Sequence, residues 1–256
     1  MTLAFSAPPR THSFVSRLDP RWKLAALLFA AAVAASLHTL AASSAALAAA
    51  LLLAFLARLP PRWFLERLAA LALFLVFFTL PLPWLLADDR GWTWGFVRFS
   101  PHGAEVALRL AAKAVAIVTL LLVVQATAPL EATLKAAHAL RIPGLLVQLG
   151  LLTYRYVFVL ADELGRLRIA LRVRGYRNRV RRHSYRTAGH VAGTLLVRGY
   201  ERAERVGQAM RCRGFDGQFR SLTDFSTRPA DVLAFLLIAA GAVALAAWDW
   251  LPRLSG

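Results

Sequence analysis

Residues 24–57 read LAALLFAAAVAASLHTLAASSAALAAALLLAFLA, an Ala- and Leu-rich run of 34 residues without a charged side chain. One membrane-spanning helix takes about 20 apolar residues, so this run is too long for a single crossing. Ser36, His38 and Thr39 interrupt it near its middle. The stretch therefore predicts a tight hairpin of two short membrane-spanning helices, over residues 24–37 and 40–57.

Three further apolar runs predict three more membrane-spanning helices. They cover residues 68–86, 104–127 and 232–250. Pro81 and Pro83 interrupt the first run near its end, and Arg109 and Lys113 lie in the first turns of the second, from where long side chains can snorkel to the interface. We expect an all-α, polytopic membrane protein with about five transmembrane helices plus long amphipathic cytoplasmic helices.

Composition supports a membrane protein and excludes an ordinary soluble domain. The chain has 256 residues, of which 58% are hydrophobic, a mean hydropathy of +0.53 and a net charge of +17. A soluble domain carries about 45–50% apolar residues, and a soluble nucleic-acid binder would be basic without being this apolar. We therefore expect no nucleic-acid partner. The single cysteine, Cys212, excludes an internal disulfide.

The distribution of charge predicts the orientation of the chain. Arg and Lys concentrate before residue 24, between residues 58 and 67, and from 135 to 228, whereas Asp88 and Asp89 lie in a Trp-containing loop between the third and fourth spans. The positive-inside rule places the basic segments in the cytoplasm and the acidic loop outside. This predicts a multi-pass protein of the cell's inner (plasma) membrane with its N-terminus in the cytoplasm and its C-terminus outside. The polar stretch before residue 24 is too long for the start of a signal peptide, so we expect a retained first span.

These patterns divide the chain into three segments. Residues 1–128 hold the N-terminal cytoplasmic segment and four spans, 129–228 form an Arg-rich cytoplasmic segment, and 229–256 form the C-terminal span. In the middle segment apolar residues recur at helical spacing, which predicts amphipathic helices lying on or just under the bilayer. Residues 175–184 form a basic connector between them.

A phrase within this segment occurs twice. Residues 170–176 read ALRVRGY and residues 209–215 read AMRCRGF, with an offset of 39 positions. Each copy ends a helical pattern with Arg in the last turn, which favours the negative end of the helix dipole, and Gly just beyond it, which supplies a left-handed cap.

Around each copy, two Arg side chains flank an Ala at positions i, i+4 and i+8, which lie on one face of a helix. Such a face lets the backbone of a partner protein approach the Ala, while the guanidinium groups reach carboxylates of that partner. The candidate docking residues are Arg166, Ala170, Arg174, Gly175, Arg205, Ala209, Arg213 and Gly214. The alternative is that these basic helices only hold anionic lipid headgroups.

Several chemistries find no support in the sequence. None of the three lysines follows a Gly, so there is no phosphate-binding P-loop for ATP, and no G-x-S-x-G occurs. The six histidines are scattered without a metal-binding spacing, so we expect neither metal nor cofactor. Asp162 and Glu163 are adjacent and diverge on a helix. We expect them to balance Arg155, Arg166 and Arg168 on neighbouring turns.

The doubled phrase carries a resemblance to a known family, and two other stretches add to it: LDPRWKL at residues 18–24 and TYRYVFVLADE at residues 153–163. The chain resembles the transmembrane coupling (T) component of energy-coupling factor transporters, in the cobalt-type CbiQ branch. That resemblance implies that the two Arg–Gly helices dock into two ABC-type ATPase subunits. It also implies a separate substrate-binding membrane subunit that captures cobalt or nickel, and a chain that is itself no enzyme.

Two other functions remain as alternatives. A membrane scaffold would use its basic helices to bind anionic lipid and nothing else. A membrane-bound lipid or isoprenoid enzyme would need a third acid near an acidic pair on the cytoplasmic side, but Asp88 and Asp89 lack one and are predicted to lie outside.

Overall fold

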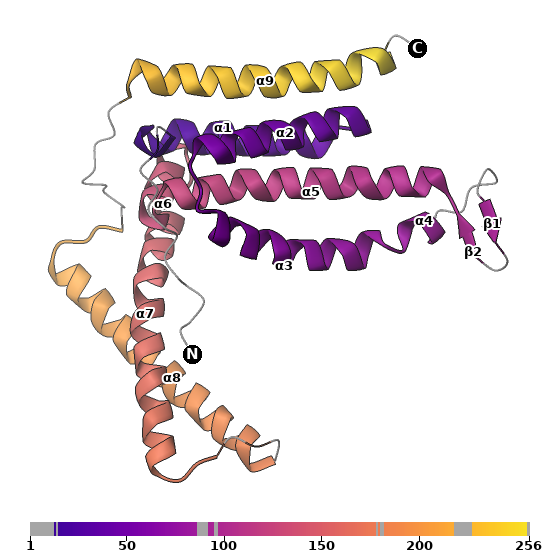
Figure 1. Ribbon diagram of the computed structural model, residues 1–256. Coiled ribbons are helices and arrows are strands. Elements are labelled where there is room, and N and C mark those ends of the chain that lie inside the picture. Colours follow the sequence, from indigo (N-terminus) through magenta and orange to yellow (C-terminus); the bar gives the residue numbers. More distant parts are fainter. Residues whose placement is uncertain are drawn as a thin grey trace. The chain divides into compact units, whose positions relative to one another are not determined.

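The computed structural model describes residue 13 and residues 15–85, 92–94, 97–177, 179, 182–217 and 227–254. Helices dominate these parts of the chain (Figure 1). In chain order the elements are the 3₁₀ turn η1 (Val15–Arg17), α1 (Pro20–Ser36), α2 (Leu40–Leu56), α3 (Pro61–Thr79), α4 (Leu82–Leu85), β1 (Trp92–Trp94), β2 (Val97–Phe99), α5 (Pro101–Thr127), α6 (Leu130–Ala139), α7 (Gly144–Val173), α8 (Arg182–Cys212) and α9 (Pro229–Leu254). The two strands form a small antiparallel hairpin in an otherwise helical chain.

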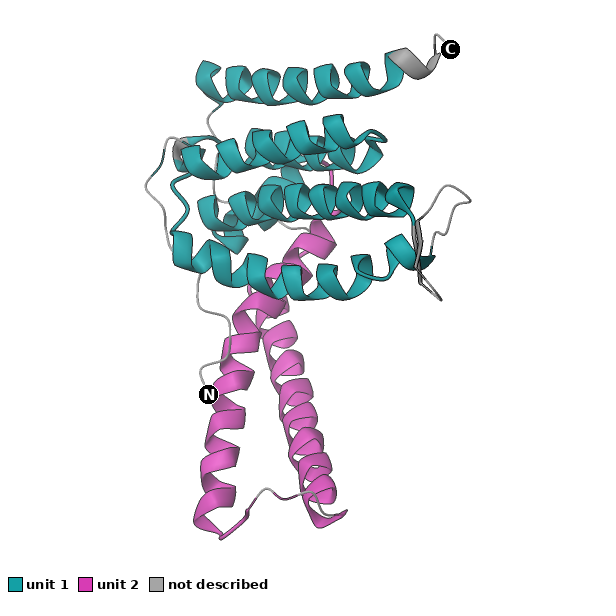
Figure 2. Cartoon of the chain, turned by 45° about the vertical axis from the view of Figure 1, so that its right-hand side comes forward, with its two compact units in different colours: residues 1–140, 223–256 teal, residues 141–222 magenta. Residues whose placement is uncertain are grey.

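Two compact units make up the chain (Figure 2). Unit 1 comprises residues 1–140 and 223–256, and unit 2 comprises residues 141–222. Helix α6, which the sequence analysis placed with the basic middle segment, packs against α1 within unit 1.

Unit 1 is a bundle in which α1, α2, α3, α5 and α9 run roughly side by side (Figure 1). Its core is built largely from alanines: Ala50 of α2, Ala57 just beyond α2 and Ala116 of α5 are almost wholly buried. Small side chains let helix backbones approach closely, which is how helices in membranes associate when lipid offers no hydrophobic driving force between them.

The close packing is tightest where α4 meets the start of α5. A Cβ placed on Gly103 would lie 2.8 Å from the carbonyl oxygen of Leu82 and 2.9 Å from the Cα of Pro83. Ser100 caps α5 by accepting a hydrogen bond from the Gly103 N–H at 3.3 Å, and its own N–H donates to the Pro83 carbonyl. Glycine is therefore required at this position for backbone contact.

The two helices of the predicted hairpin are present, but neither is among the described helices long and apolar enough to count as a membrane span. Helices α1 and α2 have 17 residues each and are separated by residues 37–39. At 1.5 Å per residue each is about 26 Å long, near the lower limit for crossing a bilayer. Thr39 caps α2 with its side chain, which accepts a hydrogen bond from Ala42.

Four stretches of described helix are long and apolar enough to cross a membrane, judged by length and composition. Three of them, 61–85, 101–127 and 229–251, contain spans expected from the sequence. The fourth is α7, which the sequence analysis read as amphipathic because its apolar residues recur at helical spacing within an Arg-rich segment. The first half of α7 is nearly free of charge, and only its second half is basic.

The exposed face of α3 is strongly apolar. Leu73 and Phe77 remain 77% and 82% exposed, and the rings of Phe74 and Phe78 stack at 6.4 Å. Exposed apolar surface of this extent is unfavourable in water and ordinary against lipid. Together with the span lengths, it makes this a multi-pass membrane protein.

Candidate docking site

The two copies of the repeated phrase end their helices with the same hydrogen-bond pattern. At the end of α7, the Gly175 N–H donates to the Arg172 carbonyl and the Tyr176 N–H to the Leu171 carbonyl, each at 3.0 Å. Gly175 has a φ of +76°. These are the two bonds of a Schellman motif, in which a left-handed residue turns the chain away from the helix.

The end of α8 repeats this geometry. The Gly214 N–H donates to the Arg211 carbonyl at 3.0 Å and the Phe215 N–H to the Met210 carbonyl at 3.1 Å, with φ +82° at Gly214. The left-handed glycine caps expected from the sequence are thus confirmed in both copies. Each helix presents its last turn, with Arg174 or Arg213 at the cap position, in the same conformation.

All eight candidate docking residues lie on the surface of unit 2. Within α7, the spacing of Arg166, Ala170 and Arg174 places them along one side of the helix, and Arg205, Ala209 and Arg213 are spaced in the same way along α8. The two alanines are themselves exposed, so each set leaves a small side chain between two long basic ones.

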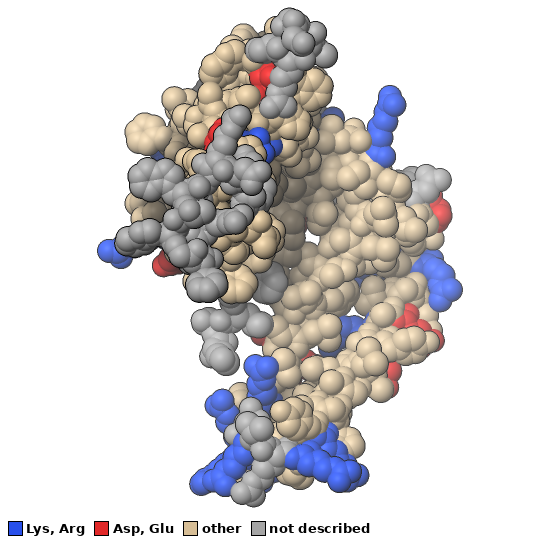
Figure 3. All heavy atoms as spheres, turned by 90° about the vertical axis from the view of Figure 1, so that its right-hand side faces the viewer, with Lys and Arg blue, Asp and Glu red and all other residues tan. Residues whose placement is uncertain are grey.

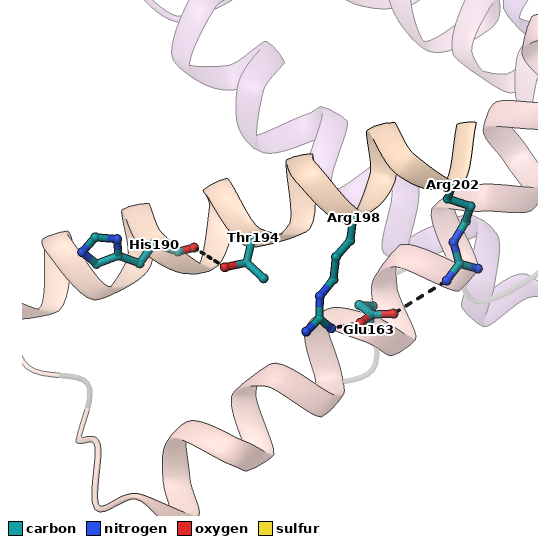
Figure 4. Close-up of polar contacts among 5 residues, drawn as sticks. All are labelled: Glu163, His190, Thr194, Arg198 and Arg202. Atoms are coloured by element: carbon teal, nitrogen blue, oxygen red, sulfur yellow. Dashed lines mark hydrogen bonds and ion pairs between the residues drawn. The ribbon is translucent and has the colours of Figure 1, made fainter. Parts of the chain in front are cut away.

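Helices α7 and α8 cross each other rather than packing along their lengths (Figure 1). At the crossing, a Cβ on Gly199 would lie 3.9 Å from Cδ2 of Leu160, and Glu163 forms ion pairs with Arg198 and Arg202 (Figure 4). Leu160 and Gly199 are separated by 39 positions, as are Glu163 and Arg202, which is the offset of the repeated phrase. The helices therefore cross at equivalent positions of the repeat.

This crossing keeps the two copies apart. Leu160 lies 14 residues before Arg174, and Gly199 lies 14 residues before Arg213. At 1.5 Å per residue, each Arg–Gly end stands about 21 Å from the crossing point along its own helix. The structure places the three residues of each docking face along one helix. The two faces lie on two separate arms, which are the parts of α7 and α8 between the crossing point and the Arg–Gly end.

Glu163 has one expected partner and two that were not expected. The sequence analysis paired Asp162 and Glu163 with Arg155, Arg166 and Arg168 of the same helix. Arg166 does interact electrostatically with Glu163, but the ion pairs come from α8, where Arg198 donates a hydrogen bond to the carboxylate and Arg202 lies 3.9 Å away. The crossing brings these two α8 arginines to the carboxylate, and periodicity along a single helix cannot reveal such a contact. A surface ion pair is worth about 0–1 kcal/mol, so these pairs mark the crossing point and add little to the stability of the unit.

Basic side chains gather where α7 ends and α8 begins (Figure 3). The connector is closed by the Tyr176 hydroxyl, which donates to the Ser184 carbonyl at 3.4 Å, and by the Arg179 N–H, which donates to Oγ of Ser184 at 3.3 Å. The exposed arginines of this end are Arg168, Arg172, Arg174, Arg177, Arg179, Arg182 and Arg186. One docking face thus lies beside a strongly positive patch.

Sequence reasoning missed a second polar arrangement, which lies in unit 1. Asp249 of α9 is 2% exposed and accepts hydrogen bonds from the His38 and Thr39 N–H groups at 2.6 and 2.9 Å, and from the Thr39 hydroxyl. At the other end of α9, Asp231 accepts from the Asp19 N–H at 3.0 Å and the Arg228 N–H at 2.8 Å. Asp249 thus binds backbone donors at the start of α2, and Asp231 binds a backbone donor at the start of α1.

Helix α5 complements this arrangement from the other side of the α1–α2 hairpin. Arg109 donates to the His38 carbonyl at 2.6 Å, and Lys113 donates to the Ala35 carbonyl at 3.2 Å. The sequence analysis expected these two side chains to snorkel to the interface, and they contact the end of α1 and the turn that follows. The carbonyls at a helix C-terminus lack intrahelical partners, and cations there are favourable.

In the parts of the chain that the structure describes, no group of three or more His, Cys, Asp or Glu side chains could hold a metal ion. Asp88 and Asp89, the acidic pair considered for a lipid enzyme, lie outside the described residues. Cys212, within the second copy of the phrase, is an exposed free cysteine.

The fold and the two Arg–Gly ends together define a multi-pass membrane protein that carries a crossed pair of basic helices. The family profile described as "CbiQ: Cobalt transport protein" matches residues 11–224. The chain belongs to this family of cobalt transport proteins.

Individual relatives agree with the family match. The chain is 33% identical over 134 residues to the cobalt transport protein CbiQ of Rhodobacter capsulatus, a match covering 52% of this chain and 53% of that protein. It is 26% identical over 136 residues to an uncharacterised protein of Methanocaldococcus jannaschii, covering 53% and 50% of the two chains. A second uncharacterised protein of that organism is 28% identical over 102 residues, covering 40% and 35%. The matched region spans about half the length of the first two relatives.

Proposed function

We propose that this chain is the transmembrane coupling subunit of an ATP-driven importer of cobalt or nickel ions. It is not an enzyme in this proposal, but transmits the movement of two ABC-type ATPase subunits to a substrate-binding integral membrane subunit. It lies in the inner (plasma) membrane with its N-terminus in the cytoplasm, and residues 129–228 contain the coupling helices. The observation that carries the proposal is the crossing of α7 and α8 at positions equivalent in the repeat.

The crossing of α7 and α8 supports binding of this chain to two partner subunits of the same kind. The ends of α7 and α8 have the same cap, the same Arg-x-x-x-Ala-x-x-x-Arg face and the same distance from the crossing. The chain therefore presents two copies of one surface. A single partner, or a lipid surface, has no need for two matched faces on separate arms. Two copies of one kind of subunit, each with a groove containing carboxylates, fit this arrangement because guanidinium groups form bidentate pairs with carboxylates.

Movement of the two partners relative to each other would act at the ends of two levers. Each arm measures about 21 Å from the crossing to its Arg, so a displacement at the ends changes the angle between α7 and α8. The contacts that would yield include the ion pairs of Glu163 with Arg198 and Arg202 and the apolar packing of Leu160 on Gly199. In the proposal, the metal is captured by the substrate-binding subunit, and this chain supplies no cofactor or metal site.

The test is the affinity of the purified chain for its ATPase subunits after removal of single arginines. Removing one partner of a buried, hydrogen-bonded charge pair at an interface costs about 2–5 kcal/mol, which is a loss of about 30-fold or more in affinity. We expect this loss for Arg174→Ala and for Arg213→Ala, and no metal uptake by cells carrying both changes.

Arg172 and Arg211 provide a matched control. They are also 39 positions apart and exposed in the same last turns, but they lie two residues from the docking face, on another side of the helix. We expect Arg172→Ala and Arg211→Ala to retain ATPase binding within about 1 kcal/mol.

Equal losses of ATPase affinity for the docking pair (Arg174, Arg213) and the control pair (Arg172, Arg211) would mean that binding depends only on positive charge. That result would favour the anionic-lipid scaffold, for which each Arg contributes about 1 kcal/mol of surface attraction. Normal metal uptake by the Arg174→Ala, Arg213→Ala double variant would refute the coupling function.

A further inference from the structure

An apolar cavity of about 600 Å³ lies within unit 1 and is partly open on one side. Helices α1, α2 and α9 form most of its wall, and Leu120 and Val123 of α5 complete it. Along α1 it extends from Trp22 to Leu37, which is about 22 Å at 1.5 Å per residue. We call this cavity the α1–α9 slot.

Small residues create the slot. Ala26, Ala30 and Ala34 repeat at every fourth position of α1, and Gly241 and Ala242 lie opposite on α9. Four alanines of α2 line the cavity as well: Ala45, Ala46, Ala49 and Ala50. Their short side chains leave a long space between the helices that no residue of the surrounding helices fills.

The slot is apolar along its shaft and polar at one end. Lys23 and Asp231 are the ionisable residues among those lining it, and both lie at the Trp22 end. Lys23 donates to the Thr127 carbonyl at 3.1 Å, while Asp231 binds the Asp19 and Arg228 N–H groups. These side chains hold the protein's own backbone, so nothing along the shaft could orient a polar ligand.

Trp22 marks the polar end as an interfacial position. Its ring packs edge-on against Phe235 with centroids 5.3 Å apart, and its indole N–H points to the Thr227 hydroxyl at 3.5 Å. Indoles prefer the membrane interface, where the ring is in hydrocarbon and the N–H reaches polar groups. Arg228 is exposed at this same end, next to the start of α9.

We propose that the α1–α9 slot holds one acyl chain of a membrane phospholipid, with the lipid phosphate beside Arg228. Water would find no hydrogen-bond partners along the shaft, and an empty space of this volume would forfeit the dispersion contacts of its wall. A single hydrocarbon chain suits the apolar wall, the slot is longer than the about 15 Å depth of one leaflet's hydrocarbon, and the positive end suits a phosphate.

Photolabelling of the full-length protein in lipid bilayers tests this proposal. The probe is phosphatidylglycerol carrying a diazirine near the end of one acyl chain, and mass spectrometry locates the adducts. We expect adducts on slot-lining residues of α1, α2 and α9 even when bulk lipid is removed by dilution into detergent before irradiation. Adducts on the exposed face of α3 around Phe77 report bulk lipid and should form only when the protein is irradiated without that dilution.

Neighbouring alanines of α2 provide matched variants. Ala49→Phe places a ring in the slot, whereas Ala48→Phe places the same ring on an exposed position that does not line it. We expect Ala49→Phe to lower the slot adducts several-fold and Ala48→Phe to leave them unchanged, with circular dichroism confirming equal helix content.

Three results would overturn the proposal. Dilution before irradiation could abolish slot and α3 labelling together in the unsubstituted protein, which would mean bulk lipid contact alone, and this comparison needs no variant to fold. Unchanged slot adducts in folded Ala49→Phe would place the label elsewhere. Loss of slot adducts when the chain is purified with its partner subunits would identify a protein segment as the occupant.

Discussion

Replacing Asp249 with alanine removes the carboxylate that binds the start of α2. Its two oxygens accept the N–H groups of His38 and Thr39, which no intrahelical carbonyl can satisfy because they precede the first turn. A buried donor left without an acceptor costs about 1–3 kcal/mol, so two such donors cost about 2–6 kcal/mol. His38 and Thr39 are not fully buried, so we expect the lower part of this range, about 2–4 kcal/mol.

The measurement is the free energy of unfolding of the purified chain in mixed micelles, from titration with a denaturing detergent followed by circular dichroism. Asp162→Ala serves as the control, because Asp162 is exposed on α7 and its loss should change the stability by no more than about 0.5 kcal/mol. Asp249→Asn keeps the shape and one carbonyl oxygen, so it should fall between Asp249→Ala and the unsubstituted protein.

A loss below about 1 kcal/mol for Asp249→Ala would refute the reasoning, since it would equal the effect of an ordinary surface substitution. It would mean that another acceptor reaches the two N–H groups when the carboxylate is removed.

Two glycines give further tests of the described geometry. Gly103→Ala should destabilise unit 1 by about 1–3 kcal/mol in the same titration, because its Cβ would lie 2.8 Å from a backbone oxygen. A gain in stability, as expected for Gly→Ala in a helix with open space, would contradict the close contact of α4 and α5. Gly214→Ala should cost about 1–2 kcal/mol and speed hydrogen exchange of the Phe215 amide, because φ is +82° there although space is open. Gly207→Ala, with open space and no positive φ, should leave that amide protected, and equal exchange in both variants would exclude a backbone cause.

Features determined by neighbouring residues could be predicted from the sequence. The break between α1 and α2 follows from Ser36, His38 and Thr39, and Thr39 does cap α2. The two Arg–Gly ends follow from glycine's access to positive φ, and both adopt it. In each case the determining interactions span only a few residues, so composition and spacing were sufficient.

Features determined by distant residues could not be predicted. The α7–α8 crossing depends on contacts between Leu160 and Gly199 and between Glu163 and α8, which no single-helix pattern encodes. The sequence analysis gave no role to Asp231 or Asp249. From the sequence alone, a carboxylate at the end of an apolar helix indicates only where the membrane-spanning segment ends. Its structural role becomes visible once its hydrogen-bond partner is known.

Helix boundaries show a related effect. Helix α3 begins at Pro61, seven residues before the span expected from hydropathy, because Pro at its first position starts the helix while Arg62, Glu66 and Arg67 keep the early turns polar. Hydropathy detects where a helix enters hydrocarbon, and this differs from where the helix begins.

The contacts of α9 bear on how the protein is made. Asp249 is 211 residues from His38, and Asp231 is 212 residues from Asp19, so the first helices to leave the ribosome are completed by the last. At about 5–20 residues per second, the α1–α2 hairpin waits about 10–40 s in the membrane before its carboxylate partners have been synthesised. During that interval its N–H groups need a temporary acceptor, such as lipid headgroups or an insertion factor. A ribosome that stops before α9 therefore leaves an α1–α2 hairpin that lacks the carboxylates of Asp231 and Asp249 as acceptors.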